Sequence, residues 1–211
     1  MKKINELDNQ NLMMLLELRK SGILDDRIFN AITSFSRKMF LPDNLKGFYK
    51  EDIDLKIFSN VISSRTSDIA KMLFLGVSKN SNTRNVLEIG TGSGWQTALL
   101  SKIYQRVYTI EINKQAYQFS SNILKNISNK ISYKYGDGKK GWIEAGPFDA
   151  IYIDCLVEDE PKFLYSNLAG KDGVVILVKD YSGNQFYSCY SPKAKDILYK
   201  STYKVSRDKI I

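Results

Sequence analysis

The first third of the chain carries apolar residues at helical spacing. Residues 9–20 place leucines three and four positions apart, and a Ser-Gly pair ends the run. A second run follows the same period, and either Asp25 or Asp26 can cap its start. Ser67 is placed to cap a third helix that continues to about Val77. The pattern therefore predicts a helical N-terminal part.

Beyond residue 84 the period changes to an alternation of strands and helices. The predicted strands cover 85–89, 106–111, 131–135, 148–154 and 173–179, and the predicted helices cover 94–104, 114–127 and about 161–168. This order is typical of a parallel sheet covered by helices. Two last strands, 184–191 and 196–205, meet at a turn at Pro192. We predict an α/β fold, with a doubly wound, mostly parallel seven-stranded sheet, an antiparallel C-terminal strand and an N-terminal helical extension.

Length and composition are consistent with one domain. The chain has 211 residues, of which 43 % are apolar, enough to enclose the core of one α/β domain and short for two. No repeat or interdomain linker divides it. We predict a single domain over residues 1–211. Residues 1–78 form its helical part, irregular over 40–66, and residues 84–211 form the sheet.

Three glycines follow the first predicted strand at intervals of two: Gly90, Gly92 and Gly94. At the carboxyl end of a strand, such a turn lets the backbone approach an adenosine-type ligand. Glu111 ends the next strand, where a carboxylate can accept hydrogen bonds from ribose hydroxyls. The alternative is that the glycines only shape a tight turn, but three glycines in five residues exceed that need, because each carries an entropic cost.

The spacing of the glycines distinguishes two ligand classes. A dinucleotide fingerprint reads G-x-G-x-x-G, and its third glycine position holds Trp95 here, so an oxidoreductase is disfavoured. A second motif, "YGDG", follows the third strand and brings Asp137 to the same sheet edge as Glu111. The alternative for Asp137 is a surface turn, because Asp-Gly pairs are frequent in turns.

Composition excludes several kinds of chemistry. The chain has no His, so Ser-His and Cys-His nucleophilic catalysis and a His general base are ruled out. Its two cysteines, Cys155 and Cys189, cannot build a Cys/His metal site without His, and we expect no metal. We expect two reduced thiols, and the alternative is one disulfide between them.

Charge and hydropathy bear on partners and location. The net charge is +8, but the lysines are scattered, which favours a solvated basic surface over a polyanion site. No apolar run approaches the roughly 18 residues of a membrane span, and the N-terminal "MKKINELDNQ" lacks the apolar region of a secretory signal. We expect a cytoplasmic protein that does not bind membranes.

Taken together, these motifs resemble the class I S-adenosylmethionine-dependent methyltransferases, and within them the protein-L-isoaspartate O-methyltransferases. The resemblance covers about residues 10–190, with its segments in the family's order. They are "LRKSGILDDRIFNAITSFSRKMFLP", "VLEIGTGSGWQTALL", "RVYTIEI", "YGDG", "PFDAIYID" and "LAGKDGVVILV". The aromatic-Gln pair after the last glycine is the part more specific to this family.

The resemblance implies S-adenosyl-L-methionine as cofactor and assigns residues to it. Glu111 would hold the ribose hydroxyls, and Asp137 and Gly138 would meet the adenine. The residues implied along the methionine part are Glu88, Gly90, Thr91, Gly92 and Gly94, and Ile112 and Asp154 complete the predicted cofactor-binding set.

One element departs from the family pattern. The family carries Thr-Ile-Ser-x-Pro beside the substrate, where this chain reads "NVISSRTSDIAKML". Counting back from Ala70 selects Ser64 as the catalytic serine, whereas matching on Ile62 selects Ser63; both are equally well explained as ordinary loop or capping serines. The segment "CLVEDEP" after Asp154 also replaces a small, Ala-rich segment of the family's substrate pocket.

The chemistry of methyl transfer limits which group can accept the methyl. A carboxylate is ionised at neutral pH, since its reference pKa is about 4, so methyl transfer to it needs no general base. Adenine or glutamine N-methylation usually accompanies an Asn/Asp-Pro-Pro-aromatic motif, absent from "IDCL", and a cytosine-5 type nucleophile at Cys155 would follow a proline, where Asp154 stands.

The sequence therefore predicts an S-adenosylmethionine-dependent O-methyltransferase that esterifies the free carboxylate of L-isoaspartyl residues in damaged proteins, a repair function. The ester can then collapse to a succinimide. Isoaspartyl peptides and proteins are the expected partners, nucleic acid is not favoured, and a monomer or small homo-oligomer is expected. Two alternatives stay open: a divergent member that methylates another acceptor such as RNA, and a protein that binds the cofactor without turnover.

Overall fold

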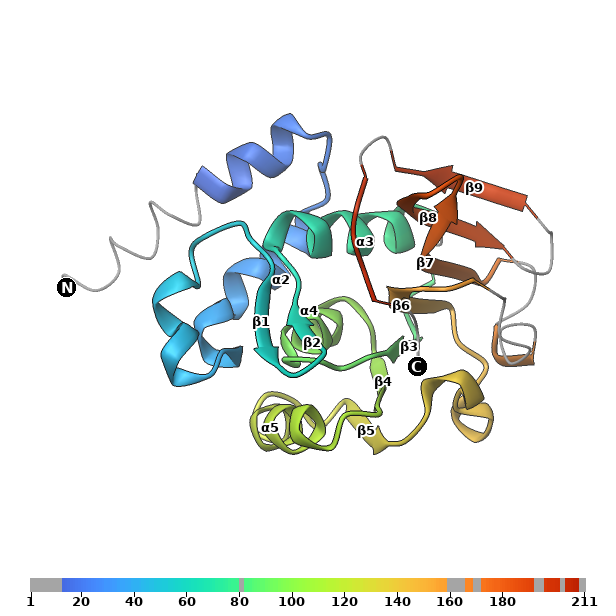
Figure 1. The fold of residues 1–211 in the computed structure, drawn as a ribbon. Coiled ribbons are helices and arrows are strands. Elements are labelled where there is room, and N and C mark those ends of the chain that lie inside the picture. Colours follow the sequence, from blue (N-terminus) through green and yellow to red (C-terminus); the bar gives the residue numbers. More distant parts are fainter. Residues whose placement is uncertain are drawn as a thin grey trace.

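The computed structural model describes residues 13–79, 82–158, 166–168, 172–191, 196–201 and 204–208. Its centre is a seven-stranded sheet in the order β5-β4-β3-β6-β7-β8-β9. The strands are β3 (Asn85–Ile89), β4 (Arg106–Glu111), β5 (Ile131–Tyr135), β6 (Ala150–Leu156), β7 (Val174–Tyr181), β8 (Asn184–Ser191) and β9 (Asp196–Lys200). Strands β3 to β7 pair in parallel, and β8 and β9 pair antiparallel. The predicted fold class is confirmed (Figure 1).

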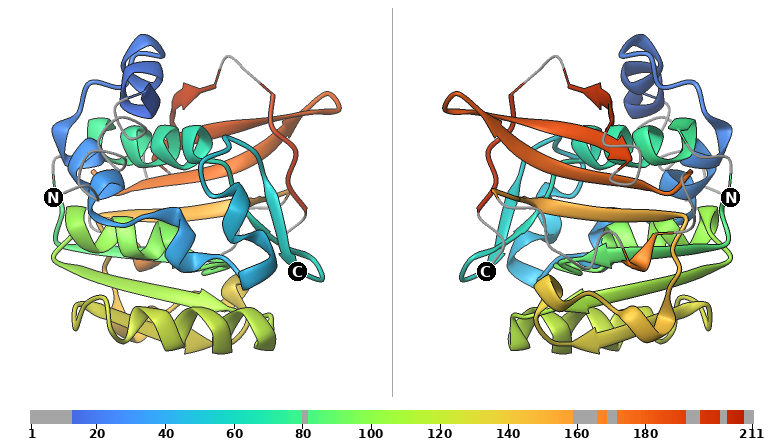
Figure 2. Two further views of the ribbon diagram at one scale, coloured as in Figure 1. Left: turned by 90° about the vertical axis from the view of Figure 1, so that its left-hand side faces the viewer. Right: turned by 90° about the vertical axis from the view of Figure 1, so that its right-hand side faces the viewer.

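Helices cover the sheet, and the N-terminal part of the chain adds further helices before its first strand. A first helix is described over residues 13–20 and is followed by α2 (Asp26–Ser34) and α3 (Thr66–Lys79). Helices α4 (Trp95–Ile103) and α5 (Lys114–Leu124) connect the parallel strands. Helix α5 lies at the β5 end of the sheet, opposite the antiparallel strands (Figure 2).

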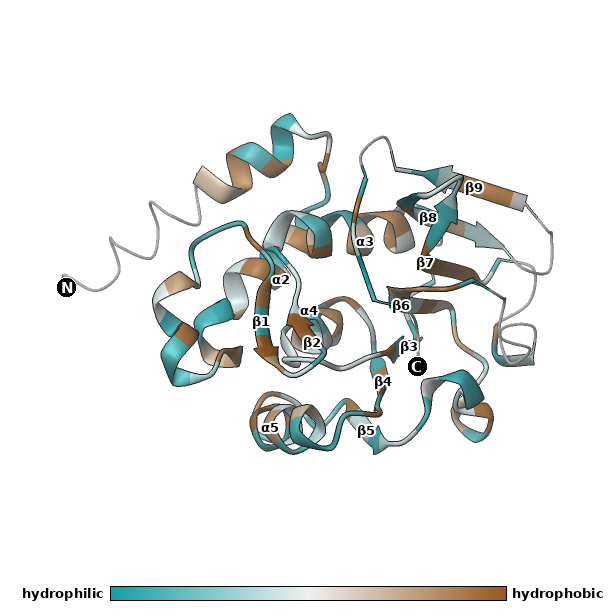
Figure 3. Ribbon diagram, in the orientation of Figure 1, coloured by the Kyte–Doolittle hydropathy of each residue, from teal (hydrophilic) through white to brown (hydrophobic). Residues whose placement is uncertain are grey.

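Both faces of the sheet are buried, because successive strand residues point into different cores. Val86 and Tyr152 belong to the core that also holds α2, α3 and α4. Their neighbours Leu87 and Ile151 belong to the core on the other face. The central strands β6 and β7 are accordingly largely hydrophobic, whereas α5 mixes polar and apolar residues around its turns (Figure 3). Apolar runs without polar alternation are typical of parallel strands buried on both faces.

Several predicted boundaries match the structure. The strands predicted at 85–89, 106–111, 131–135 and 184–191 have the observed ends, and Asp25 caps α2 by accepting a hydrogen bond from the Arg27 N–H. Helix α4 agrees to within a residue at each end.

Other predictions need correction. Helix α3 begins at Thr66, so Ser67 lies inside its first turn, and its backbone N–H is bonded to the Asp52 carboxylate. The strand predicted at 148–154 is shifted by two residues, and Phe148 makes only an isolated bridge to Leu168. Helix α5 ends three residues early, and β7 begins at Val174 and continues to Tyr181.

The predicted C-terminal strand over 196–205 divides, because β9 ends at Lys200 and Val205 bridges back to Gln185. The predicted turn at Pro192 and most of the predicted helix at 161–168 lie outside the described residues.

The stretch predicted as irregular, 40–66, contains helices and strands that the sequence pattern did not predict. Two 3₁₀ helices, η1 (Arg37–Phe40) and η2 (Asp43–Phe48), lead into the antiparallel hairpin β1 (Leu55–Phe58) and β2 (Val61–Ser63). This hairpin stands beside the carboxyl ends of the parallel strands. Among the described residues, no helix combines the length and the apolar character needed to cross a membrane.

Candidate functional site

A cavity of about 360 Å³ lies at the carboxyl edge of the parallel strands. One wall is the sheet edge, and the other is formed by the β1–β2 hairpin and the segment 207–208. The lining residues fall into three groups: Asn60–Ser64 with Ile69; Ile89–Ser93 with Gln96, Ile110–Asn113 and Gly138; and Asp154, Cys155, Arg207 and Asp208. The cavity therefore joins segments from both ends of the chain.

The glycine turn forms one side of this cavity. Gly90, Gly92 and Gly94 have φ angles of +90°, +54° and +85°, a region that side chains disfavour. The Gly90 N–H donates to the carbonyl of Ile110, which holds the turn against β4. Gly94 does not line the cavity; it precedes α4, and a Cβ there would lie 3.1 Å from the Cβ of Ser120. Gly90 and Gly92 do line it.

Glu111 sits at the end of β4 and is 5 % exposed. Its Oε2 accepts the N–H of Gly92 and its Oε1 accepts the N–H of Asn113, each at 2.8 Å. Burial raises the pKa of this carboxyl group, and the two N–H donors partly offset the rise. Each oxygen keeps a further lone pair, so the carboxylate can still accept from a ligand hydroxyl.

Glu88 does not line the cavity, contrary to the expectation that it contacts the methionine part of a cofactor. Its Oε2 accepts from Thr97 at 2.5 Å and from Thr109 at 2.7 Å, and Thr109 is bonded to Thr91. Burial raises the pKa of Glu88 to about 8. Glu88 thus supports the turn from beneath, through Thr91, which does line the cavity.

Of the two predicted adenine contacts, one lines the cavity and the other does not. Gly138 lines the cavity, and a Cβ there would lie 2.2 Å from Cγ2 of Ile89, so only glycine fits. Ile112 also lines it and is 43 % exposed. Asp137 does not line it, because its carboxylate turns to cap the following 3₁₀ turn at the N–H of Lys139.

Both candidate serines line the cavity, but they have different partners. The Ser63 hydroxyl lies 3.4 Å from the guanidinium of Arg37, which also binds the carbonyl of Ser63 at 2.7 Å. The Ser64 hydroxyl donates to Oδ2 of Asp154 at 2.5 Å. Ser64 therefore links the hairpin to the end of β6, whereas Ser63 links it to η1.

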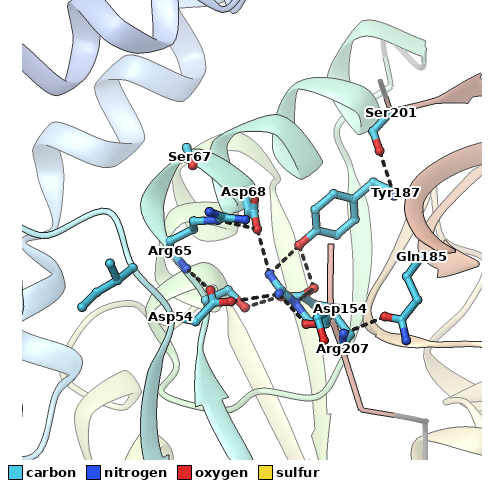
Figure 4. A network of polar contacts seen from close by, with 12 residues as sticks. Asp54, Arg65, Ser67, Asp68, Asp154, Gln185, Tyr187, Ser201 and Arg207 are labelled. Atoms are coloured by element: carbon cyan, nitrogen blue, oxygen red, sulfur yellow. Dashed lines mark hydrogen bonds and ion pairs between the residues drawn. The ribbon is translucent and has the colours of Figure 1, made fainter. Parts of the chain in front are cut away.

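Arg207 completes the cavity from the C-terminal segment and binds carboxylates from three separate segments of the chain (Figure 4). Its Nε binds Asp154 at 2.7 Å, its Nη1 binds Asp54 at 3.1 Å and its Nη2 binds Asp68 at 3.1 Å. The guanidinium is 4 % exposed. Burial opposes its charge, but Asp154, Tyr187 and Asp54 outweigh burial and raise the pKa of Arg207.

Sequence reasoning missed Arg207, together with Tyr187, Asp54 and Asp68. None lies in a motif, and the separation of Arg207 from Asp54 is 153 residues. The sequence shows Asp54, Asp68 and Asp154 as acidic residues, but no local pattern indicates that one cation joins all three.

Two residues considered for other chemistry have structural surroundings. The Trp95 ring turns away from the cavity, and its Nε1–H donates to the carbonyl of Phe35 at 2.9 Å. Cys155 lines the cavity, but burial, together with Asp154 and Glu111, raises the pKa of its thiol to about 12. A protonated thiol is a poor nucleophile, which disfavours covalent catalysis at Cys155.

Comparison with known proteins agrees with this geometry. Residues 8–206 match the family model described as protein-L-isoaspartate(D-aspartate) O-methyltransferase. Two relatives named protein-L-isoaspartate O-methyltransferase are similar over most of their length. The protein of Hahella chejuensis is 33 % identical over 200 residues, covering 92 % of both chains, and that of Photobacterium profundum is 35 % identical over 175 residues, covering 82 % of this chain and 81 % of its own.

A solved structure shares the fold. The crystal structure of a protein from Plasmodium falciparum, described as a putative protein-L-isoaspartate O-methyltransferase in complex with S-adenosyl-L-homocysteine, superimposes with a TM-score of 0.75 at 20 % identity. The match covers 94 % of this chain and 97 % of that one.

Proposed function

We propose, because the chain belongs to the protein-L-isoaspartate O-methyltransferase family, that it transfers a methyl group from S-adenosyl-L-methionine to the free carboxylate of L-isoaspartyl residues in proteins. The observation that carries the proposal is that the glycine turn, Glu111, Ser63 and Ser64 line one cavity. A cofactor and an acceptor could both occupy this space and meet.

The lining residues fit S-adenosylmethionine. Glu111 offers a carboxylate to the ribose hydroxyls, and Gly138 and Ile112 leave an open, apolar surface for the adenine. Gly90, Thr91 and Gly92 would hold the methionine part, where positive φ angles and the missing side chains let the backbone come close. Asp154 also lines the cavity, but its oxygens are already bonded to Ser64, Tyr187 and Arg207, so we assign no cofactor contact to it.

When bound, the cofactor supplies a methyl group on a positively charged sulfonium. The chain's own task is to align the acceptor oxygen with that methyl group and to exclude competing water. No proton needs to be removed from an ionised carboxylate acceptor. The hairpin and the 207–208 segment can close the cavity over the acceptor, and Ser63 and Ser64 are the side chains on that wall that can orient it.

Methyl transfer to a matched pair of peptides tests the proposal. The protein is incubated with methyl-labelled S-adenosylmethionine and peptides that differ only in an isoaspartyl or an aspartyl linkage, and base-labile methyl ester is counted. We expect label on the isoaspartyl peptide alone. Part of the methylated peptide should then convert to the aspartyl form, which chromatography detects. Equal label on both peptides would refute the acceptor assignment.

The charge of the cavity bears on the RNA alternative. Its described lining holds Glu111, Asp154 and Asp208 as acids, and Arg207 is the one basic side chain among them, already engaged with carboxylates. Such a lining offers no free cation to pair with the phosphates of a nucleic acid. Label on the isoaspartyl peptide would also distinguish the proposal from cofactor binding without turnover. A cytoplasmic location, a single domain and a small oligomeric state stay predictions from the sequence.

A further inference from the structure

We propose that Asp154, held by Arg207, is a positioning residue. It accepts the one hydrogen bond that the Ser64 hydroxyl can donate, so Ser64 can act only as a hydrogen-bond acceptor toward a substrate in the cavity. The substrate group that meets Ser64 is then a donor, and in an isoaspartyl peptide the donors beside the reacting carboxylate are backbone amide N–H groups. The inference rests on the proposed function and adds to it the polarity of the acceptor site.

The contacts of Asp154 determine the direction of its hydrogen bonds. Its Oδ2 accepts from Ser64, and its Oδ1 accepts from Tyr187 at 3.0 Å and from Nε of Arg207 at 2.7 Å. All three partners are donors, so both oxygens of Asp154 act as acceptors. The single Ser64 proton therefore points at Asp154, and only the lone pairs of the Ser64 oxygen remain for a substrate group.

Arg207 makes this arrangement rigid. Its Nη2 also donates to the Tyr187 hydroxyl at 2.7 Å, so the proton of Tyr187 is directed to Asp154 in turn. Its own backbone N–H is held by the side chain of Gln185 at 2.7 Å, which ties the segment to β8 (Figure 4). With the guanidinium and the phenol in place, Asp154 has no freedom to release Ser64 by turning.

Arg207 also makes the site compatible with an anionic acceptor. Without it, the carboxylates of the buried Asp68 and the half-buried Asp154 would repel a substrate carboxylate. Ion pairs to both, and to Asp54, offset that charge. The arrangement thus permits approach of the acceptor without presenting an unpaired cation that would trap it.

Ser63 provides the contrast. Its oxygen lies 3.4 Å from two donor nitrogens of Arg37, so its own proton is not directed to a carboxylate. Two adjacent serines on one wall therefore have opposite polarity. A carboxylate with a neighbouring peptide N–H is a group that needs both a donor and an acceptor, which the pair can supply.

A double-mutant cycle tests the coupling. In Asp154→Asn, the Tyr187 and Arg207 donors select the amide oxygen for the Oδ1 position, so the amide NH₂ faces Ser64 and reverses the polarity of its hydroxyl. We expect the KM for an isoaspartyl peptide to rise about tenfold, with less than a twofold change in kcat and in the KM for S-adenosylmethionine. In a Ser64→Ala background the same substitution should change the peptide KM less than twofold.

Ser63→Ala supplies the matched control, because the effect of Asp154→Asn should persist in that background. Thermal unfolding of each variant reports whether the fold is retained. A merely structural role for Asp154 would give an effect of equal size in both serine backgrounds, and that result would overturn the inference.

Methylated backbone amides identify the donor. Two peptides carry an N-methyl group on the amide of the isoaspartyl residue or on that of the following residue. One of them should lose at least tenfold in kcat/KM with the parent enzyme and less than twofold with Ser64→Ala. Equal use of both peptides and of the unmodified one by the parent enzyme would overturn the inference alone. Failure of the parent to methylate the unmodified peptide would overturn the proposed function and the inference together.

Discussion

Replacing Glu111 by alanine removes a carboxylate that the structure uses in two ways. Its oxygens accept the N–H groups of Gly92 and Asn113, each at 2.8 Å, and the proposed site offers their remaining lone pairs to ribose hydroxyls. A hydrogen bond to a charged group contributes about 1.5–3 kcal/mol, and a buried N–H left without a partner costs about 1–3 kcal/mol. The substitution should therefore affect both ligand binding and stability.

We expect Glu111→Ala to weaken binding of S-adenosylhomocysteine by about 1.5–3 kcal/mol, which is roughly a 10- to 150-fold rise in Kd. Loss of the two backbone partners should lower the free energy of unfolding by about 2–4 kcal/mol, since Gly92 lies in the cavity wall and regains some water. Isothermal titration calorimetry measures the first quantity, and urea unfolding without ligand measures the second. Glu144→Ala, at an exposed position, is the control.

The pH dependence gives a second reading of the same residue. Burial raises the pKa of Glu111, and the ionised form is the one that accepts from hydroxyls. Ligand affinity should therefore fall as the pH drops from neutral, and Glu111→Ala should lose that dependence. A Kd within threefold of the parent, together with reduced stability, would show that Glu111 only shapes the turn and that the ribose binds elsewhere.

Three further predictions concern the surroundings of the cavity. Gly138→Ala should lower the free energy of unfolding by about 1–3 kcal/mol in urea, because its Cβ would lie 2.2 Å from Ile89, whereas Gly136→Ala meets no atom within 4 Å and should not. The pKa of Glu88, about 8 when folded against an ordinary 4.5, means that the folded state keeps a proton which the unfolded chain releases, so stability falls as the pH rises through that window; thermal unfolding of Glu88→Gln should lack this slope, and an unchanged slope would contradict it. Iodoacetamide should alkylate Cys155 far more slowly than a free thiol at neutral pH, since burial raises its pKa to about 12; mass spectrometry of the Cys189→Ser variant measures the rate.

Local sequence patterns were enough to predict the elements that are specified by neighbouring residues. The strands from β3 to β5 are short segments rich in β-branched and aromatic residues, and their observed ends match the prediction. Asp25 caps α2 through a neighbour two residues away. The hairpin β1–β2 was not predicted, because its strands are four and three residues long and are stabilised by packing on Leu41 and Ala116 rather than by a strong period of their own.

The site divides along the same line. Positive φ angles at Gly90 and Gly92 and the position of Glu111 at a strand end follow from local sequence, and these residues line the cavity as expected. Glu88 lies in an equally prominent motif, but side chains alternate along a strand, so its carboxylate points below the turn to Thr97 and Thr109.

By itself, then, the sequence determined the order of strands and helices, the glycine turn and the family, because each depends on residues within a few turns of one another. Only the tertiary structure decided that Ser64, rather than Ser63, meets Asp154, and that Arg207 joins them from the far end of the chain. Charges buried together must be paired whatever their separation in sequence, and no local pattern records which partner the fold will bring.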